Sequence, residues 1–247
     1  MVDAKNLIKA SLRAGRDFFG APGQGTAKAN TTTDSEPALV PIRKLEADDR
    51  DAVRAHLLAL DASDRYLRFG YAATDEQIGR YADGLDFIRD DVFGISNRRL
   101  ELIAMAHLAA GGAVGVPDCS ACAEFGVSVA KDARGRGYGT LLFERAVRHA
   151  RNDGVQMLFI HALSDNAAML AIARKGGAML EHFGSETEAF LRLPPATLDT
   201  RMTELVEQQV AETDYLLKSQ ARQFWQFLAT VQEVRRGMQD ARDRTSP

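Results

Sequence analysis

Hydrophobic positions change their period several times along the chain, and these changes predict alternating strands and helices. Residues 157–163 are apolar at almost every position, which is typical of a central strand covered on both faces. Residues 140–153 carry apolar side chains on one helical side, and 166–175 form a second helical pattern that ends at Gly176 and Gly177. This order predicts a strand–helix–strand unit at the centre of the chain.

Shorter segments precede and follow this unit. Residues 48–60 have helical spacing, and Thr74 with Gln77 predicts a capping box that opens a helix running through Tyr81. Strands are expected over residues 39–42, 92–95, 100–109, 124–130, 179–183 and 188–193. The fold class that follows is α/β, with helices and strands mixed along one domain.

The two ends of the chain differ from this centre. Residues 20–37 are rich in small and polar residues without periodicity, so 1–37 is expected to form a flexible N-terminal segment and linker. A short amphipathic helix over 1–20 is an alternative for the first part. The proline pair at 194–195 ends the central domain, which is expected over 38–195.

Residues 196–247 have no glycine or proline before Gly237 and predict one long amphipathic helix, on the order of 40 residues and ~60 Å. Two heptad positions are largely apolar: Val206, Thr213, Gln220, Phe227 and Val234 at one, and Val210, Leu217, Phe224, Val231 and Met238 at the other. Such a helix either packs along its own domain or pairs with another chain. We favour the second, a homodimer through this helix, although Thr213 and Gln220 interrupt the seam.

Composition excludes several classes of protein. The formal charge of -3 and a pI of about 6.0 argue against a nucleic-acid binder. No apolar run approaches the ~20 residues of a membrane helix, and the first residues lack the apolar core of a signal peptide. Cys119 and Cys122 provide too few ligands for a structural zinc site, so no metal is expected. The expected location is cytoplasmic, without nucleic-acid or membrane partners.

The most informative segment is a glycine turn, Arg134-Gly135-Arg136-Gly137-Tyr138-Gly139-Thr140, between a predicted strand and a predicted helix. Glycines permit positive φ, and the free amides at a helix start attract phosphate. Lys131 adds positive charge to that of the two arginines. A dinucleotide-binding turn requires Gly-x-Gly-x-x-Gly directly after the strand, and a phosphate loop requires Gly-Lys-Ser/Thr. Neither pattern is present.

The turn and its surroundings resemble the GNAT acyltransferase superfamily, whose signature is Arg/Gln-x-x-Gly-x-Gly/Ala between a strand and a helix. Arg134, Gly137 and Gly139 match its defined positions. The resemblance spans about 38–193 and is strongest over 122–178. It implies a GNAT-like mixed, mostly antiparallel sheet flanked by helices, followed here by the long C-terminal helix.

The resemblance also implies a co-substrate, acetyl-CoA, and residues that bind it. By analogy, backbone groups of Val127, Ser128 and Val129 would pair with the pantetheine arm, and Asn166 would lie near the cofactor. The pyrophosphate would be held by the backbone of the turn, that is by Arg134, Gly135, Arg136, Gly137, Tyr138, Gly139 and Thr140.

Acyl transfer to an amine needs a group that accepts the amine proton. Glu124 matches a position that family members often use as general base, and it shares a strand face with the small residues Gly126 and Ser128. Many relatives place a tyrosine acid in a Tyr-x-x-x-Gly-Phe pattern, where this chain has Ala173 and, after Gly177, Ala178. His107 and His161 lie in apolar strands and are interpreted as hydrogen-bonded core residues.

The resemblance places the acceptor site near residues 61–91 and 183–188. Acidic residues are abundant in the first of these segments: Asp61, Asp64, Glu76, Asp83, Asp86, Asp90 and Asp91. An acidic rim would favour a cationic amine, either a small molecule or a protein lysine, and a solvated surface is the alternative. The segment 63–69 is similar to one in bacterial protein-lysine acetyltransferases. The sequence therefore predicts an acetyl-CoA-dependent N-acetyltransferase; a catalytically inactive acyl-CoA-binding module is the alternative.

Overall fold

The computed structural model of the chain describes residues 40–111 and 121–244, with side chains up to Gln226. The expected N-terminal segment and linker, and the loop that holds Cys119, lie outside these residues.

A seven-stranded sheet organises the described part of the chain, in the order β1-β2-β3-β4-β5-β7-β6. The strands are β1 (Arg43–Leu45), β2 (Asp91–Ser96), β3 (Leu102–Ala110), β4 (Cys122–Val129), β5 (Met157–Leu163), β6 (Met179–Phe183) and β7 (Glu186–Arg192). Every neighbouring pair is antiparallel except β4 and β5, which run parallel. The expected mixed, mostly antiparallel sheet is confirmed.

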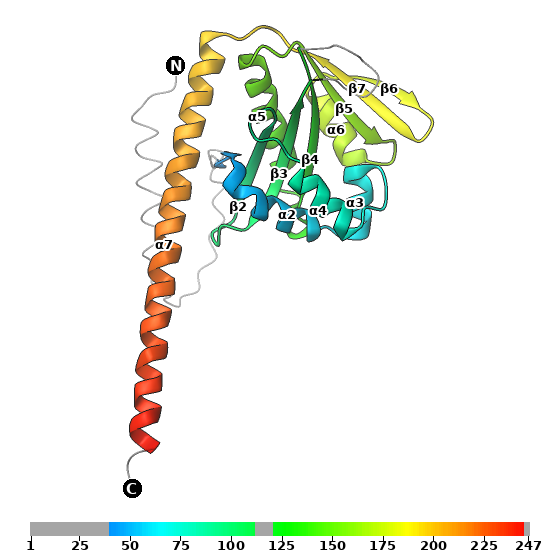
Figure 1. Ribbon diagram of the computed structural model, residues 1–247. Helices are drawn as coiled ribbons and strands as arrows, with labels where there is room; N and C mark the ends of the chain where they lie inside the picture. Colours follow the sequence, from blue (N-terminus) through cyan, green and yellow to red (C-terminus); the bar gives the residue numbers. More distant parts are fainter. Residues whose placement is uncertain (1–39, 112–120, 245–247) are drawn as a thin grey trace, which may run out of the picture. The chain divides into compact units, whose positions relative to one another are not determined.

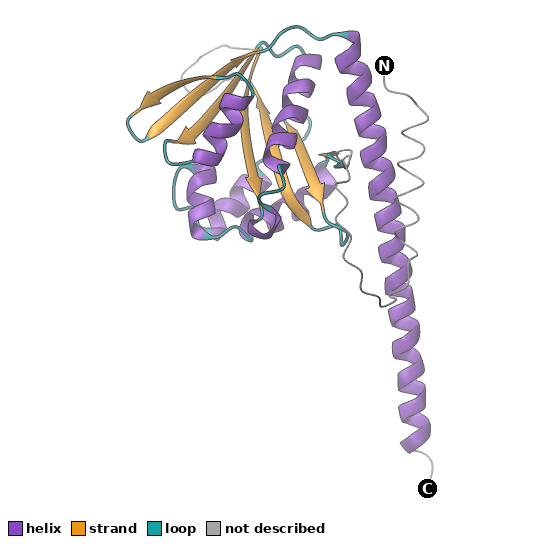
Figure 2. Cartoon of the chain, turned by 180° about the vertical axis from the view of Figure 1, so that it is seen from behind, coloured by secondary structure: helices purple, strands orange, loops and turns teal. Residues whose placement is uncertain are grey.

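Helices cover both faces of this sheet (Figures 1 and 2). One face carries α2 (Arg50–Leu58), α3 (Ala62–Phe69) and α4 (Asp75–Asp83), and the other carries α5 (Tyr138–Asn152) and α6 (Ala167–Lys175). Alternation along the strands divides the core accordingly. Phe93 and Phe125 pack under α5 and α6, whereas Met105 packs with Leu57 and Ile78 of the opposite layer.

Most local predictions agree with these bounds. The capping box is present, with the backbone N–H of Gln77 donating to Thr74 Oγ1 at 3.3 Å and that of Thr74 donating to Gln77 Oε1 at 2.9 Å. The strand expected over 39–42 is wrong for its described residues, 40–42, because ladder pairing begins only at Arg43. Pro41 lies within this apolar segment. Because proline has no backbone N–H, it cannot donate a hydrogen bond to a neighbouring strand.

The C-terminal helix α7 (Leu198–Arg244) has 47 residues, or ~70 Å at 1.5 Å per residue. It contacts α5 and β1. None of the described helices is long and apolar enough to cross a membrane.

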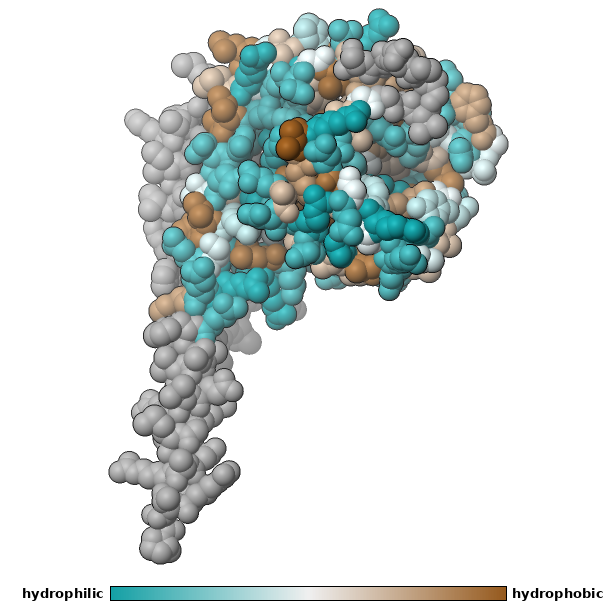
Figure 3. All heavy atoms as spheres, viewed as in Figure 1, coloured by the Kyte–Doolittle hydropathy of each residue, from teal (hydrophilic) through white to brown (hydrophobic). Residues whose placement is uncertain are grey.

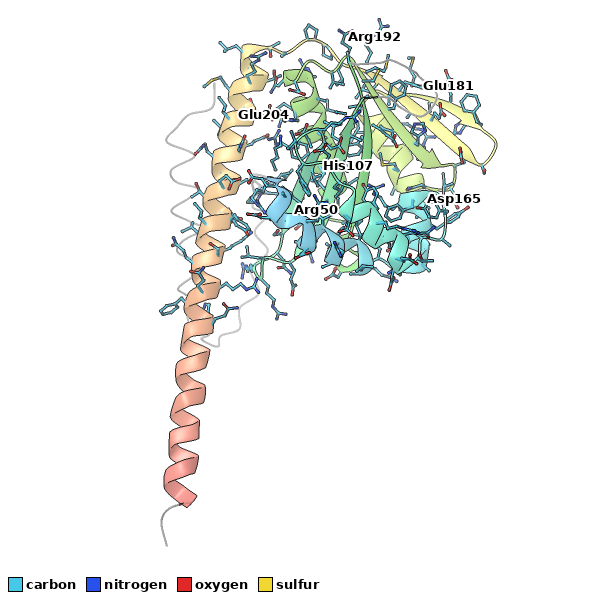
Figure 4. All side chains as sticks on the ribbon, in the orientation of Figure 1. Arg50, His107, Asp165, Glu181, Arg192 and Glu204 are labelled. Carbon is cyan, nitrogen blue, oxygen red and sulfur yellow. The ribbon has the colours of Figure 1, made fainter. Side chains whose placement is uncertain are left out.

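Ion pairs hold α7 against α5. Glu204 of α7 lies on the side of the helix that faces the domain (Figure 4). It accepts from Arg145 at 2.6 Å and from His149 Nδ1 at 2.5 Å, while His149 Nε2 lies 2.9 Å from Asp91 of β2. Arg145 is only 2% exposed, so the charges that join helix and sheet are largely removed from water.

Titration of His149 follows from this environment. Burial by itself lowers the pKa of the imidazole, but the hydrogen bonds to Asp91 and Glu204 outweigh burial and raise it to about 9. Burial likewise raises the pKa of Glu204, and the bonds from His149, Asn152 and Arg145 lower it far below its usual value. At neutral pH both groups are therefore charged.

We expect the stability of the described domain to depend on pH through His149. Its folded pKa of about 9 lies above the ordinary 6.5, so its contribution is complete below pH 6.5 and is lost as the pH rises through 9. At ~1.4 kcal/mol per tenfold change in proton affinity, the loss is about 3 kcal/mol. Urea unfolding of wild type and His149→Gln at both ends of this range measures it. If the free energy of unfolding changed with pH by the same amount in both proteins, the prediction would be contradicted.

Within the described side chains, the predicted heptad seam is mostly on the outer side of α7, and Val210 is half-buried. Val206, Leu217 and Phe224 are 41%, 62% and 58% exposed, whereas the domain-facing side carries polar groups around the buried Ala211. Figure 3 shows several hydrophobic residues, in brown, along the described part of this helix. The helix thus packs on its own domain through charges and leaves its apolar stripe uncovered.

Candidate acyl-CoA site

Strands β4 and β5 are paired only at their beginning. The parallel ladder joins Cys122, Ala123 and Glu124 to residues 157–159, and the rest of β4 is paired with β3 alone among the described residues. Beyond Glu124 the β5-facing side of the β4 backbone is therefore available to a ligand that can accept and donate hydrogen bonds along a strand.

Three residues are predicted to meet such a ligand: Val127, Ser128 and Val129. All three lie in the part of β4 that pairs with β3 but not with β5. The Ser128 hydroxyl is already engaged within the protein, because it lies 2.9 Å from Nε2 of the buried His56. The other imidazole nitrogen lies 3.0 Å from the carbonyl oxygen of Leu102. Burial lowers the pKa of His56, so the imidazole is neutral: Nδ1–H donates to Leu102 and Nε2 accepts from Ser128.

The glycine turn follows directly. Gly135 and Gly137 have φ of 74° and 77°, a region that favours glycine, and Gly137 is the N-cap of α5. No side chain caps this helix, and its first turn holds no acidic residue. The amides of Tyr138, Gly139 and Thr140 thus remain free for an anion at the positive end of the helix dipole.

The basic residues of the turn are partly neutralised. Lys131 lies 3.3 Å from Asp61, and Arg134 is paired with Asp64 of α3. Arg134 Nε also donates to the carbonyl of Val129 at 3.2 Å, and this bond fixes the turn to the end of β4. Arg136 forms no ion pair with a described residue and keeps its full charge for a phosphate.

Asn166 joins the second half of the site. Its side-chain oxygen caps α6 by accepting from the Met169 amide at 3.1 Å, and its Nδ2 donates to the carbonyl of Leu67 at 3.4 Å. The helix α6 is also pressed against the turn, since a Cβ on Gly139 would lie 3.0 Å from Ile172 Cδ1. Asn166 therefore connects α3 to the cofactor side of the site.

Tyr138 and Ala173, the position where many relatives have a tyrosine, both belong to the hydrophobic core. Tyr138 is half-buried and packs against the hydrophobic cluster that contains Phe93 and Phe125. Ala173 is fully buried in the same cluster.

Glu124 is the last β4 residue in the ladder with β5, opposite Phe159 on that strand and Ala109 on β3. Side chains alternate along a strand, so its carboxylate shares a face with Gly126 and with the layer of α3 and α4. This face is only partly covered at Glu124. The carboxylate therefore lies where the two strands begin to separate, on the side open to an acceptor.

A chain of polar side chains borders Glu124, and the sequence did not reveal it. Arg68 Nη2 donates to the Tyr81 hydroxyl at 2.8 Å, and this hydroxyl lies 2.8 Å from His107 Nδ1. His107, near the middle of the sheet (Figure 4), reaches Asp90 through Nε2 at 3.1 Å. These residues come from α3, α4, β3 and the loop before β2, and no sequence spacing connects them.

The proton positions in this chain follow from the charges. Burial and the positive charge of Arg68 lower the pKa of His107, although Asp90 and Glu124 oppose the shift. A neutral His107 that donates Nε2–H to Asp90 must accept at Nδ1, so the Tyr81 hydroxyl donates to it. The interpretation of His107 as a core histidine thus holds only in part, because its partners border Glu124.

The acidic residues expected to form a rim are already engaged. Asp61, Asp64, Glu76, Asp83, Asp90 and Asp91 pair with lysine, arginine or histidine, and Asp86 accepts from the amides of Ile88 and Arg89. Helix α3 and its neighbours therefore offer little free negative charge, and the sequence count overstated it.

The last strand pair carries carboxylates that have no lysine or arginine partner among the described residues. Glu181 lies opposite Glu188, and Glu188 lies 3.7 Å from His161 Nδ1 on β5. The interpretation of His161 as a core histidine is wrong: the residue is exposed, at the part of β5 that β4 no longer accompanies. In the described parts of the chain, no group of three or more His, Cys, Asp or Glu could hold a metal ion.

Comparison with known proteins agrees with this geometry. Residues 40–179, more than half of the chain, match the acetyltransferase (GNAT) domain family. The GNAT domain of S. lividans PAT aligns with a TM-score of 0.53 and 21% identity, over 62% of this chain and 89% of that one. A protein of Acinetobacter baylyi proposed to be an acetyltransferase aligns with a TM-score of 0.51 and 16% identity, over 63% and 93%.

The chain therefore belongs to the GNAT acetyltransferase family. At these identities the solved structures support the fold alone. Members of the family generally use acetyl-CoA and act on amines, in small molecules or in proteins.

Proposed function

We propose that this protein transfers an acetyl group from acetyl-CoA to a primary amine by direct attack. One observation carries the proposal: β4 and β5 separate immediately after Glu124. The part of β4 that no longer pairs with β5 leads to the start of α5, which no described side chain caps. A thioester with a pantetheine arm and a pyrophosphate fits this arrangement, because each part meets free backbone groups of the matching kind.

In this proposal the pantetheine arm pairs with the β5-facing backbone groups of Val127 and Val129. Ser128 lies between them, and its own backbone pairs with Met105 of β3. Amides of Tyr138, Gly139 and Thr140, with the charge of Arg136, bind the pyrophosphate. Glu124 accepts the proton of the attacking amine, directly or through water, since it faces the layer from which an acceptor approaches. The bound thioester supplies the acyl group and a thiolate leaving group.

For the acceptor we propose a cationic amine, either a small molecule or a protein lysine. The support comes from Glu181 and Glu188 on the last strand pair, which have no lysine or arginine partner among the described residues. These carboxylates attract a positively charged amine toward the edge of the site. The bound cation loses one proton to solvent before it attacks, and Glu124 accepts the second proton as the nitrogen bonds to the acyl carbon.

An acyl-CoA-binding module without catalysis is the second candidate, and Ala173 favours it. The usual tyrosine acid is absent, and the space at this position is filled by the core. Both candidates require acyl-CoA binding, whereas only the first requires turnover.

The experiment that separates them measures thiol release from acetyl-CoA with a panel of amines and lysine peptides, together with the affinity for CoA. Acceptor-dependent thiol release supports the acetyltransferase. Tight binding of CoA without release on any acceptor identifies the binding module. Absence of CoA binding contradicts both.

We also propose that α7 joins two copies of the chain. Its outer stripe includes Val206, Leu217 and Phe224, and the heptad spacing continues in the sequence to Met238. A second copy of the same helix is the partner that matches a heptad stripe, because knobs and holes then share one repeat.

Replacing Leu217 and Phe224 together with Glu should convert a dimer into a monomer, because two charges would be buried in an apolar seam. The molar mass of the full chain in solution, measured by light scattering, should fall to half. Gln223→Glu, at an exposed position of the same turn, is the matched control and should leave the mass unchanged. A wild-type chain that is already monomeric at high concentration would refute the proposal.

A further inference from the structure

Arg68 lies flat on the strand β4. A Cβ added to Gly126 would lie 3.0 Å from the guanidinium Cζ, 3.0 Å from Nη2 and 3.1 Å from Nη1. Three nearly equal distances mean that the planar group faces the glycine rather than touching it by an edge. Glycine at position 126 is what permits this approach.

Aromatic and polar neighbours fix the guanidinium in this position. Its Cζ lies 5.2 Å from the centre of the Phe69 ring and 5.4 Å from that of Tyr81. The Tyr81 hydroxyl accepts from Nη2 and is itself held by His107, which is held by Asp90. The charge is therefore preorganised by a chain of partners rather than by a flexible side chain alone.

This charge is not neutralised within the described chain. No described carboxylate lies within 4.0 Å of the Arg68 guanidinium, and its buried Nε has no hydrogen-bond partner there. Arg65 on the same helix, by contrast, is paired with Asp75, and its guanidinium donates to the carbonyls of Leu58 and Leu60. Holding an uncompensated cation against a strand costs free energy, which a bound anionic group would offset.

The place of the Arg68 guanidinium on β4 suggests which anionic group it would bind. Gly126 is two residues beyond Glu124, on the same face and in the part of β4 that β5 no longer accompanies. Helix α3 contacts both strands, and the bond from Asn166 to Leu67 holds it there. The guanidinium thus lies over β4, the strand that borders the gap where the reacting end of a pantetheine thioester would lie.

We propose that Arg68 stabilises the negative charge that develops on the thioester oxygen and then on the CoA sulfur during acyl transfer. The inference rests on the proposed acyl-CoA site. The amine nitrogen forms a bond to the acyl carbon, Glu124 takes the amine proton, and the carbon–sulfur bond breaks with its electron pair on sulfur. The fixed cation at Gly126 lowers the energy of that thiolate, so no tyrosine acid is needed at position 173. Tyr81, His107 and Asp90 are positioning residues.

The test measures the pKa of the CoA thiol when CoA is bound, from the ultraviolet absorbance of its thiolate during a pH titration. It requires no turnover. An opposite charge within ~4–6 Å lowers a pKa by about one unit or more, so we expect the bound thiol to titrate about one pH unit below free CoA. Arg68→Met should abolish the shift, and Arg68→Lys should retain part of it.

Gly126→Ala provides a second variant that keeps the charge. The new methyl group moves the guanidinium off the strand, so the thiol pKa should again return toward that of free CoA while the fold persists. Arg80→Met, which removes an exposed arginine paired with Glu76 on α4, is the control and should leave the shift unchanged.

The outcomes are distinct. An unshifted thiol pKa in the wild type, or a shift that survives both Arg68→Met and Gly126→Ala, overturns the role of Arg68. A shift that depends on Arg68 without acylation of any amine supports stabilisation of a bound thiolate by Arg68 and sinks both the proposed transferase and the role of Arg68 in acyl transfer. With turnover, Arg68→Met should lower kcat about 100-fold with a small change in KM, as expected for loss of one oxyanion partner. Failure of the wild type to bind CoA refutes both proposals.

Discussion

Replacing Glu124 with Gln should lower kcat for acetyl transfer by about 100- to 10,000-fold, the range for loss of a positioned general base. The substitution keeps the size of the side chain and removes only its capacity to accept a proton. Glu124 precedes the part of β4 that is proposed to bind CoA and that no longer pairs with β5. The affinity for CoA should therefore stay within about threefold of that of the wild type. Steady-state kinetics with a saturating amine, together with CoA titration, measures both quantities.

Glu144→Gln is the control for this result. Glu144 on α5 is a half-exposed carboxylate near Lys175. Its replacement also removes one negative charge, but at a position outside the gap between β4 and β5. Its kcat should equal that of the wild type. A Glu124→Gln protein with wild-type kcat would show that the amine proton is accepted elsewhere, and the proposed role of Glu124 would fall.

Glu204→Ala should produce the largest loss of stability among single substitutions on α7. Glu204 accepts from Arg145 and His149, and its removal leaves two buried or half-buried cations without their common partner. Breaking a buried pair on one side costs about 3–5 kcal/mol, and here Glu207, 3.8 Å from Arg145 Nε, offsets part of it. We expect a loss of about 3 kcal/mol in urea unfolding, with faster amide exchange along the start of α7.

Glu212→Ala tests whether this effect is specific. Glu212 is on the same helix and forms no ion pair with a described residue, so its removal should change stability by less than ~0.5 kcal/mol. Similar losses for both variants would mean that the loss does not come from the Glu204 network.

Local chemistry made several features predictable. The apolar run 157–163 coincides with β5, and the Thr74 capping box opens α4, because both depend on neighbours in sequence. The glycines at 135 and 137 also have the positive φ that a strand-to-helix turn was expected to need. At Pro41 an apolar pattern gave the wrong answer, since hydrophobicity does not report whether a backbone amide can donate.

Pairing between distant residues was not predictable. Seven acidic side chains suggested a charged rim, yet most of them pair with residues far along the chain, such as Asp64 with Arg134, and only Glu76 and Asp86 have purely local partners. His161 lies in an apolar run and is nevertheless exposed, because β4 leaves β5 before reaching it. Counting charges along a sequence cannot show which of them are neutralised in the fold.

The sequence by itself determined the family-like domain, the glycine turn, the candidate base Glu124 and the presence of a long C-terminal helix. These follow from periodicity, from backbone conformations that favour glycine, and from residues that lie close together along the chain. Only the tertiary structure decided that α7 packs through Glu204 while its heptad stripe stays outside, and that Arg68 lies on Gly126 beside the gap. Those contacts join elements far apart in sequence, so their energies depend on burial and distance, which only the folded chain sets.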